Sequence, residues 1–214
     1  MDMNWVYAGI AMVLSYLCGS IPTSVWWGKA FFGVDVREHG SRNAGATNTF
    51  RVLGAKAGVP VLLIDVLKGF APVRMLAFWS GLENGSADFT WLRVAMVLAT
   101  VGGHLYPVFA GFRGGKGVAT SLGGVLAVHP GSALVCLAVF ALVYGFTKYV
   151  SLGSLSAALA FPLAIEFIWR EHNDVMLGFA IVLCVVVFWT HRTNIKRLLK
   201  GEEGRMHFDR GTAA

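Results

Sequence analysis

The chain has 214 residues, of which 56% are hydrophobic and 14% are charged, and its mean hydropathy is +0.62. This composition is too apolar for an ordinary soluble domain, and it disfavours an all-α soluble protein with an unusually apolar core. The net charge of +6 does not indicate a nucleic-acid-binding protein, because the basic residues are not gathered on one soluble face. The chain is therefore predicted to be an integral membrane protein.

Seven apolar segments predict an all-α bundle of seven transmembrane helices, since about 20 helical residues cross the roughly 30 Å core of a bilayer. The fourth segment is short and ends at His129-Pro130-Gly131, so it and the fifth are expected to form a tight pair. The sequence does not decide whether the fourth crosses fully. The bundle is expected to form a single domain, residues 1–214. The predicted helices cover residues 4–28, 58–80, 89–110, 118–129, 131–147, 150–169 and 174–191.

Lysine and arginine residues fall mainly on one side of this predicted bundle. With the N-terminus outside and the C-terminus in the cytoplasm, 14 of the 18 cations lie in cytoplasmic segments, chiefly the loop 29–57 and the tail 192–214. The external loop 81–88 carries Glu83 and Asp88 but no cation. Cytoplasmic loops of membrane proteins are enriched in Lys and Arg, so this distribution predicts an N-out, C-in topology.

The segment 103–120 joins the third predicted helix to the fourth and packs two cations and three glycines into five residues, Arg113 to Gly117. Glycines let backbone N–H groups converge on a ligand, and Lys116 adds a positive charge near the start of the next helix. The pattern predicts a site for an anionic, phosphate-bearing ligand. It is not the nucleotide-binding motif G-x-x-x-x-G-K-[ST], because Ala110 stands at its first glycine and Gly117 follows the lysine. The predicted phosphate contacts are Lys116 and the backbone amides of Gly114, Gly115 and Gly117.

A second polar segment lies within the loop 29–57, on the same predicted side of the membrane. It combines hydrogen-bonding side chains, glycines that permit close approach, and two arginines. A flexible loop rich in turn-forming residues is the alternative interpretation, but two glycine-and-cation segments on one face favour one shared anion site. The residues concerned are Ser41, Asn43, Thr47 and Asn48 for hydrogen bonds, Gly40 and Gly45 for close approach, and Arg37 and Arg51 for charge.

Several polar residues lie within the predicted helices or at their ends. His191 and Asn194 are three residues apart on one helical face, where they either orient a substrate or contact lipid headgroups. Asp65 and Lys68, also three apart, are predicted to pair inside the bundle and not to act in catalysis. For His104 the sequence does not decide between packing and function. The cysteines Cys18, Cys136 and Cys184 lack the spacing of a metal or redox site and read as buried apolar residues.

Four blocks stand out in chain order: Gly19-Ser20-Ile21-Pro22, Gly40 to Asn48 with Arg51, Gly103 to Thr120, and His191 to Glu203. Together they span nearly the whole chain, and they closely resemble the bacterial acyl-phosphate:glycerol-3-phosphate acyltransferases of the PlsY type. Two departures from that pattern are Arg42, where the family more often has Gly, and Ala44, where Ile is common. Both are expected to be tolerated, with Arg42 either adding a phosphate contact or changing its strength.

The resemblance implies a seven-helix enzyme of the bacterial inner membrane with its active site on the cytoplasmic side. Such an enzyme moves the acyl group of an acyl phosphate to the sn-1 hydroxyl of glycerol 3-phosphate, releasing lysophosphatidate and phosphate. The implied donor comes from a soluble phosphate acyltransferase, and no coenzyme A, metal or other cofactor is required. The expected catalytic residues are Ser41, Arg51, Lys116 and His191, and the expected substrate-binding residues are Asn43, Gly45, Thr47, Asn48, Gly114, Gly115, Gly117 and Asn194.

The residues present favour direct acyl transfer. The H-x-x-x-x-D dyad of coenzyme-A-dependent acyltransferases and the G-x-S-x-G nucleophile motif are both absent from the sequence, so no Ser or Cys stands in an activating context. An acyl phosphate has a good leaving group, so the enzyme chiefly has to orient the acceptor hydroxyl and stabilise the departing phosphate. His191 and a phosphate oxygen of the substrate are the two candidate bases.

Two other classes of protein fit part of the pattern. A phosphate or organic-anion transporter would also use glycine-broken helices and intramembrane charges such as Asp65 and Lys68. No inverted repeat is visible between the two halves of the sequence, which disfavours that interpretation. A lipid-binding membrane subunit without chemistry is the third alternative.

Overall fold

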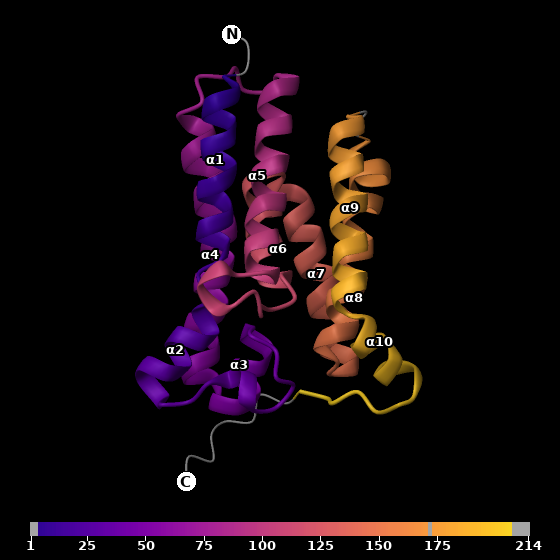
Figure 1. Ribbon diagram of the computed structural model, residues 1–214. Coiled ribbons are helices and arrows are strands. Elements are labelled where there is room, and N and C mark those ends of the chain that lie inside the picture. Colours follow the sequence, from indigo (N-terminus) through magenta and orange to yellow (C-terminus); the bar gives the residue numbers. More distant parts are fainter. Residues whose placement is uncertain (1–3, 171–172, 207–214) are drawn as a thin grey trace.

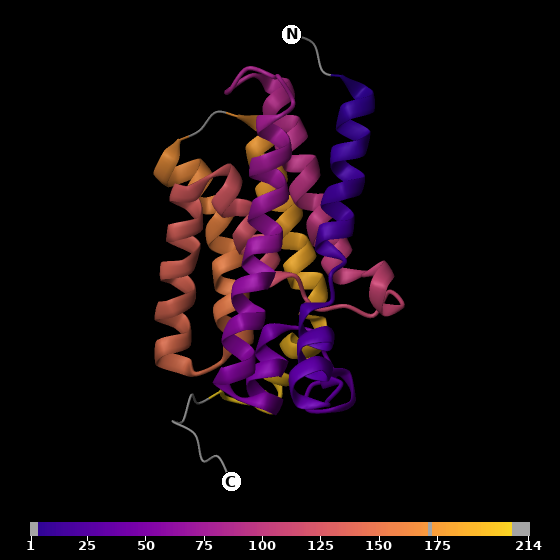
Figure 2. The same ribbon diagram turned by 90° about the vertical axis from the view of Figure 1, so that its left-hand side faces the viewer.

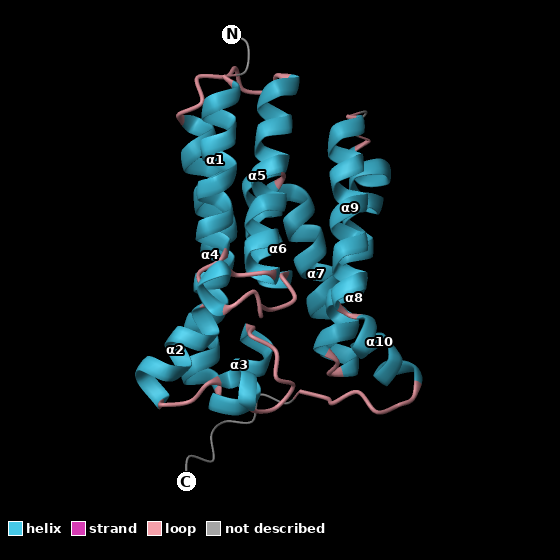
Figure 3. Ribbon diagram, in the orientation of Figure 1, coloured by secondary structure: helices cyan, strands magenta, loops and turns pink. Residues whose placement is uncertain are grey.

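The computed structural model describes residues 4–170 and 173–206, and over these residues the chain is helical without a β-strand (Figure 3). Most helices stand side by side, whereas α2, α3 and α10 gather at the lower end in Figure 1, away from the start of α1. In the turned view of Figure 2, α1 (indigo) stands at one edge and α7 (salmon) near the other. The helices are α1 (Trp5–Gly19), α2 (Thr23–Phe32), α3 (Ala46–Leu53), α4 (Ala55–Phe78), α5 (Ala87–Leu105), α6 (Val118–Val128), α7 (Pro130–Thr147), α8 (Val150–Leu163), α9 (Asp174–Thr190) and α10 (Arg192–Leu199).

Several of these helices are long and apolar enough to cross a membrane. The described residues contain four such stretches, or five if α9 and α10, which meet at 63°, count as one bent span. α4 has 24 residues but carries charges such as Asp65 and Lys68 along its length, and α6 has only 11 residues. Length and composition therefore do not establish the predicted count of seven spans. The four stretches are Trp5–Phe32, Ala87–Ala110, Pro130–Thr147 and Val150–Trp169.

The prediction of one continuous helix over residues 4–28 is wrong. α1 ends at Gly19, α2 begins at Thr23 and it continues to Phe32. The break arises because Pro22 has no N–H to donate and its ring disfavours the helical conformation at the preceding residue, Ile21. At the break the carbonyl of Ile21 accepts a 2.9 Å hydrogen bond from the N–H of Thr23 and one of 2.8 Å from Nζ of Lys68 on α4.

Two segments predicted as irregular contain helices. The loop 29–57 holds a turn of 3₁₀-helix, η1 (Val36–Glu38), and the helix α3, while α4 already begins at Ala55. Gly54, with a φ of +75°, allows the sharp turn between α3 and α4. The tail 192–214 begins with α10, and Arg210 lies outside the described residues. α3 and α10 were not predicted because both are short and polar, and apolar runs indicate only apolar helices.

The remaining helices lie within a few residues of the predicted ranges. α5 ends at Leu105, two residues before Pro107, and a 3₁₀ turn, η2 (Val108–Ala110), follows. α8 continues as a π-helix, η3 (Ala164–Trp169). α6 and α7 are joined only by His129, whose Nδ1 accepts a 3.1 Å hydrogen bond from the N–H of Ser132, so the expected tight pair is confirmed.

Glycines allow the helices to approach one another closely. A Cβ on Gly69 of α4 would lie 2.1 Å from the carbonyl oxygen of Thr120 on α6, and a Cβ on Gly19 of α1 would lie 2.0 Å from that of Thr100 on α5. Small residues at such crossings let the backbones touch, which is how helices pack in a membrane without a hydrophobic driving force. These crossings hold α6 against α4 and α5 against α1, and so they help to position the segment between α5 and α6.

The predicted pairing of Asp65 with Lys68 inside the bundle is confirmed. Nζ of Lys68 lies 2.8 Å from a carboxylate oxygen of Asp65, and both side chains are almost fully buried. The pair satisfies two charges that would be costly to bury alone, and its lysine also anchors the break between α1 and α2.

Candidate active site

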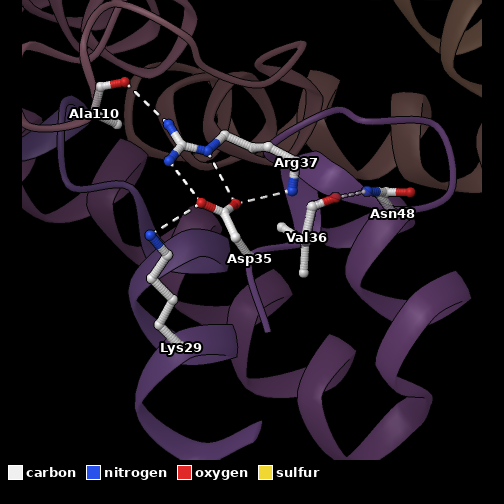
Figure 4. A network of polar contacts seen from close by, with 6 residues as sticks. All are labelled: Lys29, Asp35, Val36, Arg37, Asn48 and Ala110. Atoms are coloured by element: carbon white, nitrogen blue, oxygen red, sulfur yellow. Dashed lines mark hydrogen bonds and ion pairs between the residues drawn. The ribbon is translucent and has the colours of Figure 1, made fainter. Parts of the chain in front are cut away.

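The loop 29–57 and the segment 103–120 are joined by a hydrogen bond from Arg37 (Figure 4). Asp35 accepts hydrogen bonds from the backbone N–H, Nε and Nη2 of Arg37 at 2.8–3.0 Å, and it forms a 3.1 Å ion pair with Lys29. These partners, Arg37 first, hold the pKa of the Asp35 carboxyl well below its usual range. Nη1 of Arg37 donates a 3.1 Å bond to the carbonyl of Ala110. Arg37 therefore ties the loop 29–57 to the segment between α5 and α6.

Asn48 organises the same loop from inside. Its Nδ2 donates to the carbonyls of Val36 and His39 at 2.7 Å and 3.1 Å, and its Oδ1 accepts a 2.8 Å bond from the N–H of Ser41. The side chain also borders the cavity described below, but both halves of its amide are bonded within the loop. Asn48 therefore holds the loop together, a role that was not among its predicted contacts with a substrate.

One cavity of about 330 Å³ brings most of the predicted site residues together. It opens between α3, the start of α6, the end of α9 and α10, and it continues as an apolar groove among α6, α7, α8 and α9. Its polar end therefore adjoins a surface suited to a hydrocarbon chain. Of the predicted residues, those bordering the cavity are Ser41, Asn43, Gly45, Thr47, Asn48, Arg51, Lys116, Gly117, His191 and Asn194.

Lys116 is held in this cavity by the C-terminal segment. Its Nζ donates a hydrogen bond to Oδ1 of Asn194, and Nδ2 of Asn194 donates a 2.7 Å bond to Oε1 of Glu203. Glu203 also accepts hydrogen bonds of 2.8 Å from Ser151 and 2.7 Å from Arg197. Burial raises the pKa of Glu203, but these hydrogen bonds outweigh it and the net shift is downward, so the carboxylate stays charged. The sequence predicted no role for Glu203 or Ser151. The only signal for Glu203 was its place in the fourth block, His191 to Glu203.

The two titratable groups at the polar end have shifted pKa values. Burial, helped by the positive charges of Arg197 and Arg51, lowers the pKa of Lys116 to about 8, while Glu203 opposes the shift. Burial and the charge of Lys116 lower the pKa of His191 to about 4, so its imidazole is neutral near pH 7. Nδ1 of His191 lies 2.8 Å from the carbonyl of Val187 and donates to it, which leaves Nε2 with a free lone pair.

Arg51 and Ser41 stand at the exposed mouth of the cavity. Within the described residues the guanidinium of Arg51 makes no hydrogen bond or ion pair, so it is available to an incoming anion. Arg42 is also exposed and does not border the cavity. Its φ of +58° lies in the left-handed region, where glycine fits without strain, and this accounts for the glycine common at this position in the resembling family.

Gly114 and Gly115, predicted as phosphate contacts, do not border the cavity. Both pack against the end of α5: a Cβ on Gly114 would lie 2.0 Å from the carbonyl oxygen of His104. Gly117 does border the cavity and caps the N-terminus of α6 with a φ of +80°. Besides Glu203 and Ser151, the polar cavity residues that the prediction did not place in the site include Asp65, His104 and Ser121.

The apolar groove is built from α6 to α9. It includes small residues such as Ala157 and Ala158, which leave room beside larger side chains. Across the described residues, no three His, Cys, Asp or Glu side chains group in a way that could hold a metal ion. The apolar side chains that border the groove include Val118, Leu122, Val125, Leu137, Phe140, Phe161, Leu183 and Val187.

Comparison with known proteins identifies the family to which the chain belongs. A family model described as glycerol-3-phosphate acyltransferase matches residues 9–201. The glycerol-3-phosphate acyltransferases of Fusobacterium nucleatum subsp. nucleatum and Chlorobaculum tepidum are 48% and 41% identical to the chain. Those matches cover 92% and 93% of this chain and 97% and 96% of the relatives.

The fold is also similar to solved structures. Two crystal structures of PlsY (YgiH), an integral membrane glycerol 3-phosphate acyltransferase, match with TM-scores of 0.82 and 0.81. They are its glycerol 3-phosphate form and its lysophosphatidic acid form, each 40% identical in sequence and matched over 94% of this chain and 96% of theirs. Similarity of sequence and fold over nearly the whole length shows that the chain belongs to the glycerol-3-phosphate acyltransferase family and is a multi-pass membrane enzyme of phospholipid synthesis.

Proposed function

We propose that this acyltransferase takes its acyl group from an acyl phosphate and transfers it directly to the sn-1 hydroxyl of glycerol 3-phosphate. The products are lysophosphatidate and inorganic phosphate. The observation that carries the proposal is one continuous cavity with Lys116, Arg51 and His191 at its polar end and an apolar groove beyond them. Such a cavity suits substrates that bring phosphate groups to one end and a hydrocarbon chain to the other.

The polar end of the cavity carries several groups that attract an anion. Lys116 offers an ammonium group and Arg51 a planar guanidinium that can bind two phosphate oxygens at once. Gly45 and Thr47, at the N-terminus of α3, border the cavity, and the positive end of a helix attracts anions. Ser41 and Asn43 add hydrogen-bonding groups for phosphate or the glycerol hydroxyls.

Direct transfer needs no covalent enzyme intermediate. The sn-1 oxygen attacks the carbonyl carbon of the acyl phosphate, the new ester C–O bond forms, and the bond from that carbon to the phosphate oxygen breaks. The proton of the attacking hydroxyl goes to Nε2 of His191 or to a substrate phosphate oxygen. Orientation of the two substrates can lower the barrier by about 7–11 kcal/mol, so the base is the smaller contribution.

The membrane arrangement completes the proposal. The N-terminus lies outside and the C-terminus in the cytoplasm, so that α2, α3 and α10 face the cytoplasm with the polar end of the cavity. This follows from the excess of Lys and Arg in these segments. The enzyme then resides in the inner (plasma) membrane and receives its acyl phosphate from a soluble phosphate acyltransferase.

An assay of the purified protein in detergent tests the reaction. Palmitoyl phosphate and glycerol 3-phosphate should give lysophosphatidate without any ion gradient, and analysis of the product should locate the acyl group at sn-1. Palmitoyl-coenzyme A should give no product. Efficient use of the coenzyme A ester, or acylation at sn-2, would contradict the proposal.

A further inference from the structure

The segment that leads into Lys116 is packed directly against His104. The N–H of Gly115 donates a 3.2 Å hydrogen bond to the carbonyl of His104. A Cβ on Gly115 would lie 2.2 Å from Nε2 of His104 and 2.7 Å from the carbonyl oxygen of Ala44. The imidazole ring thus occupies the space that a side chain at position 115 would need.

His104 in turn lies beside a buried pair of charges. Its Nδ1 lies 3.8 Å from Oδ1 of Asp65, which forms the 2.8 Å ion pair with Lys68. Within the described residues Nδ1 of His104 has no hydrogen-bond partner, whereas Oδ1 of Asp65 is satisfied by its ion pair with Lys68. Burying Nδ1 of His104 without a hydrogen bond costs stability, so stability alone does not explain a histidine at this position. The side chains of His104 and Asp65 also border the cavity.

We propose that His104, which lies beside Asp65, is a positioning residue that fixes the Gly114–Lys116 segment from behind and so directs the ammonium group of Lys116 toward Asn194. The proposal rests on the role of Lys116 as the phosphate-binding cation. His104 acts through its ring, which sets the place of Gly115, and through its carbonyl, which holds the N–H of Gly115. Asp65 acts by limiting how the ring turns. Because α4 and α5 supply both residues, the segment is supported by helices and not by another loop.

A double-mutant cycle between His104 and Lys116 tests this. The kcat/KM for glycerol 3-phosphate is measured for the unaltered enzyme, His104→Ala, Lys116→Ala and the double variant. Misplacing a functional group by about 1 Å can cost about 10²-fold, so His104→Ala is expected to lower kcat/KM by about that factor. It should have little further effect once Lys116 is absent. A loss of the same size in both backgrounds would overturn the proposal.

A second readout decides the matter if Lys116→Ala leaves no measurable rate. With Lys116 released into solvent, the alkaline limb of the pH profile of His104→Ala should move to higher pH, because the lysine loses the burial that lowers its pKa to about 8. The neighbours of Lys116 that could also move this limb, namely Glu203, Arg197, Arg51 and His191, are unchanged in the variant. An alkaline limb that stays in place would show that Lys116 has not moved, and it would overturn the proposal.

Controls separate positioning from folding and from the reaction itself. His129→Ala removes a histidine that caps α7 and does not border the cavity, so it should lower stability without changing the KM for glycerol 3-phosphate. If His104→Ala does not fold, His104→Asn, which keeps a polar side chain but removes the ring and leaves the Asp65–Lys68 pair intact, replaces it in the same cycle and pH profile. A near-normal rate in Lys116→Ala alone would remove the proposed anion site and this inference with it. Additive losses would remove only the inference.

Discussion

Asn194 connects Lys116 to Glu203 with the two halves of one amide group. Oδ1 accepts a hydrogen bond from Nζ of Lys116, and Nδ2 donates a 2.7 Å bond to Oε1 of Glu203. The lysine is thereby placed without an ion pair of its own to the carboxylate, which is engaged by Arg197 and Ser151. Its charge therefore stays available to a phosphate group, and the C-terminal segment becomes part of the site.

Lys116→Ala should remove most of the activity while the protein remains folded in the membrane. Loss of a preorganised group at a developing anion costs about 2.7–4 kcal/mol, or about 10²–10³-fold in kcat. Rates of lysophosphatidate formation and thermal unfolding of the purified variant would be compared. Near-normal turnover would contradict the anion site.

Arg51→Ala should behave similarly, because the exposed guanidinium lies at the cavity mouth and has no hydrogen bond or ion pair to residues 4–170 or 173–206. Arg51→Lys should recover only part of the activity, since an ammonium group cannot bind two phosphate oxygens in a plane. Arg42→Ala is a matched control: this arginine is exposed nearby but does not border the cavity, so its loss should change kcat/KM little. Equal losses from Arg42→Ala and Arg51→Ala would indicate a general effect of positive charge.

The pH dependence should report the protonation of Lys116. Its pKa of about 8 lies below the ordinary value of 10.5, so the ammonium is fully present well below pH 8 and is lost as the pH rises through 8. The kcat/KM for glycerol 3-phosphate, which reports the free enzyme, should therefore fall above pH 8. In Lys116→Arg the guanidinium stays charged, so any remaining activity should lack this alkaline limb. An unchanged limb in that variant would assign it to another group.

His191→Ala distinguishes substrate binding from general-base catalysis. The buried imidazole is neutral, so it can accept a proton, but the substrate brings a phosphate base of its own. We expect mainly a raised KM for glycerol 3-phosphate with a smaller change in kcat. Steady-state kinetics with varied glycerol 3-phosphate would show this, and a loss confined to kcat would favour the base.

The topology can be tested with introduced cysteines in a chain whose native cysteines are replaced by alanine. Asn84, between α4 and α5, and Gly204, after α10, are both exposed, and these two segments lie at opposite ends of the bundle (Figure 1). An impermeant thiol reagent on intact cells should label Asn84→Cys and leave Gly204→Cys unlabelled until the membrane is opened. The reverse pattern would invert the orientation.

Gly114→Ala should impair the enzyme even though Gly114 does not border the cavity. Its Cβ would meet the His104 carbonyl oxygen at 2.0 Å, so the segment carrying Lys116 must shift. Gly102→Ala is the matched control, because nothing lies within 4 Å of a Cβ there. Comparable activity of the two variants would show that the segment tolerates displacement.

The apolar helices and the buried pair of Asp65 and Lys68 could be predicted from the sequence alone, and so could the residues proposed for an anion site. Apolar runs and three-residue spacing are local patterns, so a single chain reveals them without its fold. The motif with Lys116 and the loop with Arg51 could likewise be chosen from their composition, and both border one cavity in the structure.

The tertiary structure alone decided which groups face that cavity. Gly114 and Gly115 were predicted to contact phosphate, but the end of α5 fills the space beside them. The amide of Asn48 forms its hydrogen bonds within its own loop. The role of Glu203 depends on Asn194, Ser151 and Arg197 meeting at one point. Such convergence depends on how helices cross and where the chain returns, because contacts between residues far apart in sequence leave no periodic pattern in the chain itself.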